Sequence, residues 1–496
     1  MPPLTLLVFV VGMGSLGAEI AAVRLLAPYF GASTVIWANT IGVVLVALSI
    51  GYWLGGRWAD RNPSVRGLCR LALAAAVGLA VVPFVGRPLL DVGTRALDQV
   101  SAGAFLGSLV AVLVLVAIPV LLLGAVSPWA LRIAMRDVEN AGTVAGRLYA
   151  LSTAGSLVGT LTAALIWIPL VGTRRTFLIF ALLIAVVAVS GLRPLRRYAL
   201  APAAIVVLIT LPVGTLKASG EGRVVAESET EYQYARVIQR SDGSRVLELN
   251  EGQANHSIYR PGTVLTNDYW DDHLVLPFAA GRQSPPRKVA ILGNAAGTTA
   301  RAYGALFPRT RVDAVEIDPE LAKLGERWFG LRPRPELHLH AADARPWLRE
   351  SGGGFDAISV DAYRQPYIPF YLTTKEFFQL VRARLAPGGV VIVNVGHPEG
   401  ENQLEKVLTA TMKAAFPYVV RDPGEPTNTQ LVASASPIGA DELRSSLPAL
   451  PRPLRPVADD VAGRLAGPLG GGTVYTDDHA PVEWLVDRSI VQYADK

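Results

Sequence analysis

Long apolar runs dominate the first 216 residues and restrict what this part of the chain can fold into. They cover about residues 3–23, 34–54, 70–90, 104–126, 148–171, 175–192 and 199–216. Each run approaches or reaches the ~20 residues that a helix needs to cross a bilayer. We therefore predict an α-helical membrane domain with six or seven spans over residues 1–216. Small residues in the segment 146–160 further predict a close contact between two of its helices.

Charge is distributed unevenly between the two halves of the chain. Residues 1–216 contain 15 Arg, no Lys and six acids, whereas the remaining residues hold 31 Lys and Arg against 35 Asp and Glu. The arginines cluster in short segments between the apolar runs, a pattern that is typical of cytoplasmic loops. The basic excess therefore indicates membrane orientation, and we expect the bilayer, rather than nucleic acid, to be the partner of this half.

The side on which the second half lies depends on the number of spans. Seven spans with cytoplasmic basic loops would place it outside the cell. The last run is short and contains Pro202 and Pro212, which favours an interfacial or re-entrant segment. We therefore expect the second half to be cytoplasmic.

Cysteine and histidine usage limits the chemistry of the chain. Cys69 is the only cysteine, which excludes intrachain disulfides and Cys-rich metal sites. The six histidines show no zinc-binding spacing. We therefore expect no metal.

The pattern changes after residue 216. Two β-rich segments flank "SDGS" and predict a β-hairpin within residues 223–250, which opens a subdomain over 217–286. From 287 to 496, short strands alternate with amphipathic helices, starting with "KVAILG". This alternation predicts a Rossmann-like α/β domain with a mostly parallel sheet.

Polar residues follow successive strands of that sheet. Gly293 and Gly297 lie where the first strand passes into the first helix, and Glu316, Asp343 and Asp361 end the next three strands. Ligands of such sheets bind at the carboxyl ends of the strands, where an acid can accept hydrogen bonds from ribose hydroxyls. These positions predict a nucleoside site.

The second half resembles the polyamine aminopropyltransferases, spermidine synthase and its relatives, whose fold is that of the AdoMet-dependent methyltransferases. The resemblance covers roughly residues 223–400 and rests on "ESETEYQ", "NEGQ", "YWDDHLVLPF", "ILGNAAGT", "VEIDPE", "ADA", "VDAY", "LTTKEFF" and "LAPGGV". The order of the two halves and the tail motif "TDDHAPVE" are similar to membrane-embedded spermidine-synthase-like proteins of bacteria. This implies a multi-pass protein of a bacterial-type plasma membrane, and homodimerisation is left open.

The resemblance implies roles for individual residues. Gln233, Glu316 and Asp343 would bind the nucleoside beside the glycine loop. Asp361 would be the general base at the reaction centre, with Tyr269 next to it. Gln253 would line the pocket toward the acceptor amine, and we also predict that Tyr363 and Arg364, which follow Asp361, bind the substrate. The implied donor is decarboxylated S-adenosylmethionine or S-adenosylmethionine itself, and the acceptor is an amine or a membrane-associated small molecule.

Three positions depart from the family pattern. Ala296 stands where the family carries an Asp that meets the amino group of the donor, Arg364 or a neighbour replaces an acceptor-binding Asp, and Trp270 replaces a His. An arginine repels a diamine and attracts a carboxylate. Aminopropyl transfer at the membrane is still our first interpretation, because "EYQ", "NEGQ", Tyr269 and Asp361 match the family. The alternatives are methyl transfer from AdoMet and a transporter-like protein whose nucleoside domain only binds.

Overall fold

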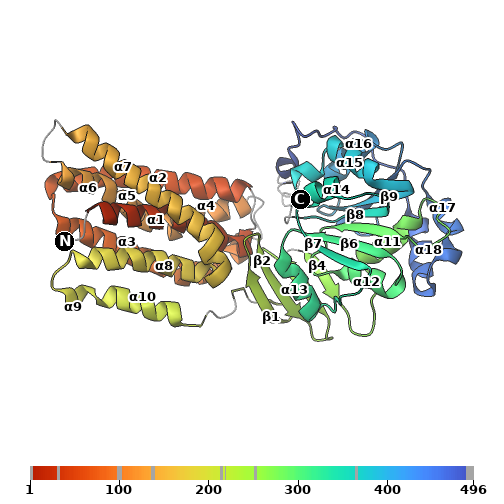
Figure 1. Ribbon diagram of the computed structural model, residues 1–496, viewed down its shortest axis with the longest axis horizontal. Coiled ribbons are helices and arrows are strands. Elements are labelled where there is room, and N and C mark those ends of the chain that lie inside the picture. The colour runs from red at the N-terminus through yellow and green to blue at the C-terminus, as the bar shows by residue number, and fades with distance from the viewer. Residues whose placement is uncertain are drawn as a thin grey trace. The chain divides into compact units, whose positions relative to one another are not determined.

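The chain divides into two compact units. The computed structural model describes residues 4–30, 34–97, 103–135, 140–212, 216–217, 219–250, 254–363 and 367–486. Residues Met1–Lys217 with Glu229–Tyr234 form a helical unit, and Ala218–Ser228 with Ala235–Lys496 form an α/β unit (Figure 1).

Apolar helices build the first unit. Their bounds are α1 Leu4–Phe30, α2 Thr34–Arg61, α3 Val65–Leu97, α4 Gly103–Leu115, α5 Ala117–Gly124, α6 Val126–Ala134, α7 Ala141–Thr162, α8 Ile168–Ser190, α9 Leu195–Tyr198 and α10 Leu200–Thr210, with a π-helical turn at Ala163–Trp167. In the described residues, five helical stretches are long and apolar enough to cross a membrane: Leu4–Phe30, Ile36–Arg61, Val65–Gly86, Ala117–Ala134 and Ala141–Ser190. The last of these has 50 residues and contains most of two predicted runs, and it is broken at Gly172, whose φ of 82° and ψ of 166° are not helical. The final apolar run yields only α10, which has 11 residues.

Small residues allow α1 and α7 to approach closely. A Cβ atom at Gly155 would lie 2.1 Å from the carbonyl oxygen of Phe9, and one at Gly159 would lie 2.1 Å from that of Met13. No side chain fits at such distances, so the two backbones contact each other through glycine. The predicted close helix contact of residues 146–160 is confirmed.

A small antiparallel sheet begins the α/β unit. Its strands are β1 Arg223–Glu229, β2 Tyr234–Gln239, β3 Arg245–Leu249 and β4 Asn255–Tyr259, paired in that order. Strands β2 and β3 form the predicted hairpin, with Ala235 opposite Leu249 and Gln239 opposite Arg245. The hairpin is confirmed, and two further strands extend it.

A seven-stranded mixed sheet forms the centre of the unit (Figure 1). Its strands are β5 Lys288–Leu292, β6 Arg311–Glu316, β7 Leu337–Ala341, β8 Phe355–Val360, β9 Leu385–Gly396, β10 Tyr418–Asp422 and β11 Asn428–Ser434. The order is β10-β11-β9-β8-β5-β6-β7. The five strands from β7 to β9 are parallel, whereas β11 is antiparallel to both β9 and β10. This arrangement confirms the predicted Rossmann-like, methyltransferase-like domain.

Helices cover both faces of this sheet. They are α11 Tyr269–Val275, α12 Thr298–Leu306, α13 Pro319–Trp328, α14 Ala344–Glu350, α15 Lys375–Arg384, α16 Gln403–Lys413, α17 Ala440–Ser445 and α18 Arg455–Arg464. Alternate strand residues point to opposite faces. Val289 and Ile291 of β5 therefore pack in the cluster that contains residues of α12 and α18, whereas Ala290 and Leu292 pack in the one that contains residues of α15 and α16.

Candidate active site

Four strand ends gather the polar residues at one edge of the sheet. Gly293 follows β5, Glu316 ends β6, Asp343 follows β7 and Asp361 follows β8. These strands are parallel neighbours in the order β8-β5-β6-β7, so their carboxyl ends lie along the same edge. The order along the sheet reverses between β5 and β8, which is the switch point where such sheets bind ligands.

The loop after β5 has an unusual backbone. Gly293 and Gly297 have φ of 92° and 88°, and Ala295 between them has φ of 45°. A Cβ atom at Gly293 would lie 2.4 Å from the carbonyl oxygen of Asp361, so only glycine fits there. Ala295 adopts the left-handed conformation without being glycine, which costs free energy and is characteristic of functional sites.

The carboxylate of Glu316 meets this loop. It accepts hydrogen bonds from the backbone N–H of Ala295 at 2.8 Å and of Asp318 at 3.1 Å. Burial raises the pKa of Glu316 to about 7, although these backbone hydrogen bonds oppose the shift. Glu316 therefore gains or loses its charge near neutral pH.

A cavity of about 380 Å³ opens at the switch point. It is lined by the loop after β5, including Gly293 and Asn294, and by Tyr269, Asp361 and Tyr363. The volume is in the range of small-molecule sites, and many of the lining residues have polar side chains that lie beside apolar ones. The structure thus brings Gly293, Tyr269, Asp361 and Tyr363 together around one cavity.

Asp361 is the acid of this cavity. Its Oδ2 atom accepts a hydrogen bond from the Tyr269 hydroxyl at 3.1 Å, and its Oδ1 atom accepts one from the Asn394 amide at 2.8 Å. Burial raises the pKa of Asp361 to about 7, and the two hydrogen bonds act in the opposite direction. A carboxylate with this pKa suits a general base at neutral pH.

A chain of hydrogen bonds from His273 through Gln430 and Asn394 orients the Asp361 carboxylate. His273 Nε2 lies 2.7 Å from Gln430 Oε1, and the Gln430 amide donates to Asn394 Oδ1 at 2.8 Å. Burial lowers the pKa of His273 to about 4, so its neutral ring donates from Nε2 while Nδ1 faces the Ser359 hydroxyl. Each member thus fixes the orientation of the next, ending at Asp361.

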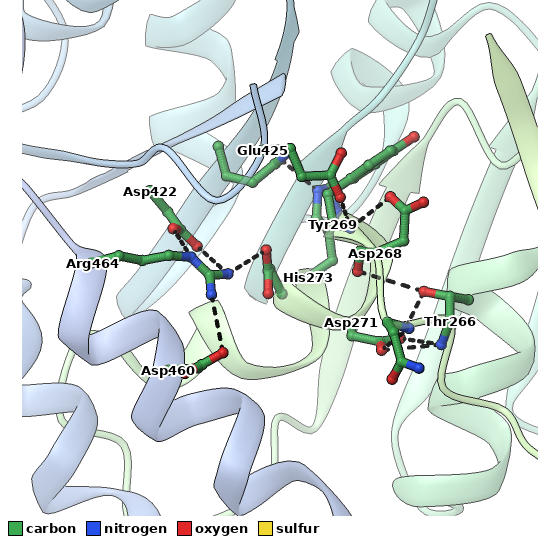
Figure 2. A network of polar contacts seen from close by, with 12 residues as sticks. Thr266, Asp268, Tyr269, Asp271, His273, Asp422, Glu425, Asp460 and Arg464 are labelled. Atoms are coloured by element: carbon green, nitrogen blue, oxygen red, sulfur yellow. Dashed lines mark hydrogen bonds and ion pairs between the residues drawn. The ribbon is translucent and has the colours of Figure 1, made fainter. Parts of the chain in front are cut away.

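Carboxylates fix the start of α11 and therefore the ring of Tyr269 (Figure 2). The backbone N–H of Tyr269 donates to Asp268 Oδ1 at 2.8 Å and to Glu425 Oε1 at 2.9 Å. Asp271 accepts the N–H groups of Thr266 and Asn267. Burial, and then the hydrogen bond to Asp268, raise the pKa of Glu425 to about 7. Carboxyl groups therefore surround the backbone N–H of Tyr269.

Arg464 ties α18 to the middle of α11 (Figure 2). Its guanidinium contacts Asp272 Oδ2 at 2.8 Å and Asp422 Oδ1 at 2.5 Å. Burial and the neighbouring Asp422 raise the pKa of Asp272 to about 7, and Arg464 opposes this shift. This pairing supports α11 without reaching the cavity.

Other predicted residues lie away from the cavity lining. Asp343 accepts the N–H of Arg345 at 3.0 Å as the cap of α14, and its Oδ2 atom accepts the Tyr371 hydroxyl at 2.7 Å. Gly297 precedes α12 as its N-cap. Gln233 is buried in the turn before β2, among the residues that group with the helical unit. Gln253 and Arg364 lie outside the described residues.

The site also contains residues that the sequence patterns did not indicate. Asn394, Gln430 and His273 were not predicted, although the polar Asn394 within the apolar strand "VVIVNVG" was a signal. Tyr363 lines the cavity with its ring, since its hydroxyl donates to the Asn394 carbonyl at 2.9 Å and accepts the Gly396 N–H. In the described part of the chain, no three His, Cys, Asp or Glu residues are placed to hold a metal ion.

Comparison with known proteins identifies the α/β unit. Residues 273–423 match the spermine/spermidine synthase domain. A probable polyamine aminopropyl transferase of Bifidobacterium longum is 29% identical over 319 residues, which cover 60% of this chain and 70% of that protein. The polyamine aminopropyltransferase of Mycobacterium tuberculosis is 26% identical over 427 residues, 78% of each chain, so that alignment includes part of the helical half.

A solved structure adds to these relatives. The crystal structure of a probable spermidine synthase from Corynebacterium glutamicum shares 22% identity, covers 51% of this chain and 98% of that chain, and has a TM-score of 0.39. The relatives named above are transferases. Residues 273–423 are thus a spermine/spermidine synthase domain, and the chain is a homologue of the polyamine aminopropyltransferases.

Proposed function

We propose that the chain transfers an aminopropyl group from decarboxylated S-adenosylmethionine to an amine acceptor at a membrane surface. The single observation that carries this proposal is the half-buried carboxylate of Asp361, with a pKa of about 7, inside the cavity at the switch point. The relatives' names supply the class of reaction.

The chemistry requires one base and good alignment. The amine nitrogen attacks the aminopropyl carbon next to the sulfonium, the C–S bond breaks, and its electron pair stays on sulfur. The products are the neutral thioether methylthioadenosine and an aminopropylated ammonium. Because the acceptor is an ammonium at neutral pH and has no lone pair, Asp361 accepts one of its protons before the attack, and holding the nitrogen in line with the C–S bond supplies much of the remaining acceleration.

Carboxyl groups that contact the cavity-lining residues Ala295 and Tyr269 suit a nucleoside donor and a cationic acceptor. Glu316 lies on the β6 side of the loop after β5, where an ionised carboxylate accepts hydrogen bonds from ribose hydroxyls. Asp268 and Glu425 place two hydrogen-bonded carboxyl groups beside Tyr269. An amine is drawn to such a site, and a ring such as that of Tyr269 stabilises a cation further.

The membrane location rests on the surface of the helical unit. Among the described residues, 30 of the 36 exposed large hydrophobic side chains fall within residues 1–216, including Trp53, Ile118 and Leu170. Apolar surface of this extent is normal in lipid and exceptional in water. We propose that this unit crosses a plasma membrane, that the α/β unit lies in the cytoplasm, and that the acceptor is membrane-associated.

Purified full-length protein in lipid nanodiscs tests the activity. With decarboxylated S-adenosylmethionine and a set of amines from putrescine to lipophilic alkylamines, we expect release of methylthioadenosine and one aminopropylated product, both measured by mass spectrometry. No methylthioadenosine above the level of the Asp361→Asn variant would overturn the proposed reaction.

Topology and substrate access have separate tests. A reporter that is active only in the cytoplasm, fused to the C-terminus of the full chain, is expected to be active, and activity of a periplasmic reporter instead would overturn the orientation. Equal turnover of water-soluble and lipophilic amines would overturn the membrane-associated acceptor.

Methyl transfer from S-adenosylmethionine is a second candidate. It is favoured by Ala296, whose methyl group packs with Leu321 and Leu324 in an apolar cluster, so position 296 offers no carboxylate to a decarboxylated donor. The same nanodiscs incubated with labelled S-adenosylmethionine test it. A methylated acceptor together with adenosylhomocysteine would replace the first proposal by this one.

A further inference from the structure

A buried amide without a partner lies in the cavity. Asn294, directly after Gly293, is 5% exposed and lines the cavity. Neither its Oδ1 nor its Nδ2 atom has a hydrogen-bond partner in the described structure. Buried amides are nearly always paired, because an unpaired one loses its bonds to water without replacement. The amide of Asn294 is therefore available to bind a ligand that enters the cavity.

The position of Asn294 tells which part of a ligand it meets. Its neighbour Ala295 donates to Glu316, the residue placed to hold the ribose, and its neighbour Gly293 contacts the backbone of Asp361. A nucleoside with its ribose at Glu316 and its sulfur toward Asp361 passes along this loop. The substituent that continues from the sulfur then lies within the cavity that Asn294 lines.

Two neighbouring side chains in the loop and in α12 are not available to bind this substituent. The side chain of Ala296 faces the apolar cluster, and the Thr298 hydroxyl is engaged with the backbone of Ile258 at 2.9 Å. His256 also lines the cavity, and its buried Nε2 atom has no partner in the described residues. Burial lowers the pKa of His256 to about 4, so this ring is neutral. The polar groups at this end of the cavity are thus uncharged.

The geometry points to Asn294 as the residue that recognises the donor tail beyond the sulfur, through a neutral amide that accepts tails with and without a carboxylate. An amide oxygen accepts from an ammonium group, and an amide N–H donates to a carboxylate. A carboxylate at this position would attract the ammonium but repel the carboxylate of S-adenosylmethionine. The inference rests on the proposed nucleoside site and names its donor class: adenosyl sulfonium compounds, both decarboxylated and intact.

Three ligands distinguish the contribution of the tail to binding affinity from that of the nucleoside. Methylthioadenosine has no charged tail, decarboxylated adenosylhomocysteine carries an ammonium, and adenosylhomocysteine carries an ammonium and a carboxylate. Calorimetric titration of the full-length protein in nanodiscs is expected to give affinities for the last two within about tenfold of each other. Asn294→Asp is expected to weaken adenosylhomocysteine at least tenfold relative to the decarboxylated ligand. Asn294→Ala is expected to weaken both.

Methylthioadenosine is the control for folding and for the nucleoside site. Its affinity is expected to change less than threefold in both variants. If wild-type protein binds no methylthioadenosine, the proposed function fails and this inference fails with it. If methylthioadenosine binds but Asn294→Asp leaves the ratio of the two tailed ligands unchanged, only the inference about Asn294 is overturned. Equal weakening of all three ligands would show that Asn294 supports the loop instead of the tail, which also overturns it.

Discussion

Replacing Asp361 by Asn removes the proposed base while keeping its shape. The amide oxygen at position 361 can still accept from Asn394, and the Tyr269 hydroxyl can turn to accept from the new N–H because a hydroxyl both donates and accepts. We therefore expect the fold and the methylthioadenosine affinity to persist. Loss of a positioned general base lowers rates by about 10²–10⁴-fold, so kcat is expected to fall by that factor.

The pH dependence of the wild-type rate tests whether Asp361 acts as the general base. The pKa of Asp361 is raised to about 7, so the ionised fraction grows from ~10% at pH 6 to ~90% at pH 8. Wild-type kcat/KM is expected to rise about ninefold over this interval through the base alone. The Tyr269 hydrogen bond stabilises the ionised form, so Tyr269→Phe is expected to move this rise about one pH unit higher.

The assay is initial-rate release of methylthioadenosine from pH 5.5 to 9 over a range of concentrations of one amine, which gives both kcat and kcat/KM. Asp356→Asn is the matched control, since Asp356 lies at the other end of β8 and pairs with Arg282 at 2.8 Å. It is expected to lower thermal stability and leave the pH profile unchanged. An Asp361→Asn variant that retains more than a tenth of wild-type kcat would refute the role of Asp361 as the base.

Three further predictions concern the nucleoside, the hydrogen-bond chain and the helical unit. Glu316→Gln is expected to lower methylthioadenosine affinity about tenfold at pH 8 and to abolish its increase from pH 6 to 8, because the raised pKa of about 7 leaves Glu316 protonated at pH 6; an unchanged calorimetric profile would contradict this. Gln430→Ala is expected to lower kcat about tenfold without changing nucleoside affinity, because it removes the hydrogen bond to Asn394. Ser434→Ala on the same strand removes a buried hydrogen bond that is not linked to Asp361, so it is expected to alter only stability. Gly155→Leu cannot fit against the Phe9 carbonyl and is expected to lower the melting temperature in detergent, with a cost of about 1–3 kcal/mol or more; an unchanged melting temperature would contradict the contact of α1 with α7.

Local patterns were sufficient for the order of elements. The predicted strand "KVAILG" and helix 319–328 correspond to β5 and α13, because alternation and amphipathic spacing are set by burial on one face. The glycines at 293 and 297 were identified because left-handed backbone strongly favours glycine. The neighbouring Ala295, which also has positive φ, could not be predicted, since its strain is imposed by tertiary contacts.

The features that could not be predicted from the sequence depend on contacts between distant segments. Gln430 reaches Asn394 only because β11 pairs with β9, and no local pattern shows that a later strand inserts between β9 and β10. The strand-end position of Asp343 was predicted correctly, but the direction of its side chain, toward the N-terminus of α14, depends on packing. The six or seven predicted spans remain a prediction, because apolar length alone does not show whether the stretch Ala141–Ser190, with its break at Gly172, crosses a membrane once or twice.

The most direct test of the account is a structure of the full-length protein with methylthioadenosine bound. The account predicts the nucleoside at the switch point, its ribose hydroxyls within hydrogen-bond distance of Glu316 and its sulfur in the cavity that Asp361 and Tyr269 line. Density for the nucleoside at any other part of the α/β unit, or a sulfur that points away from Asp361, would contradict it.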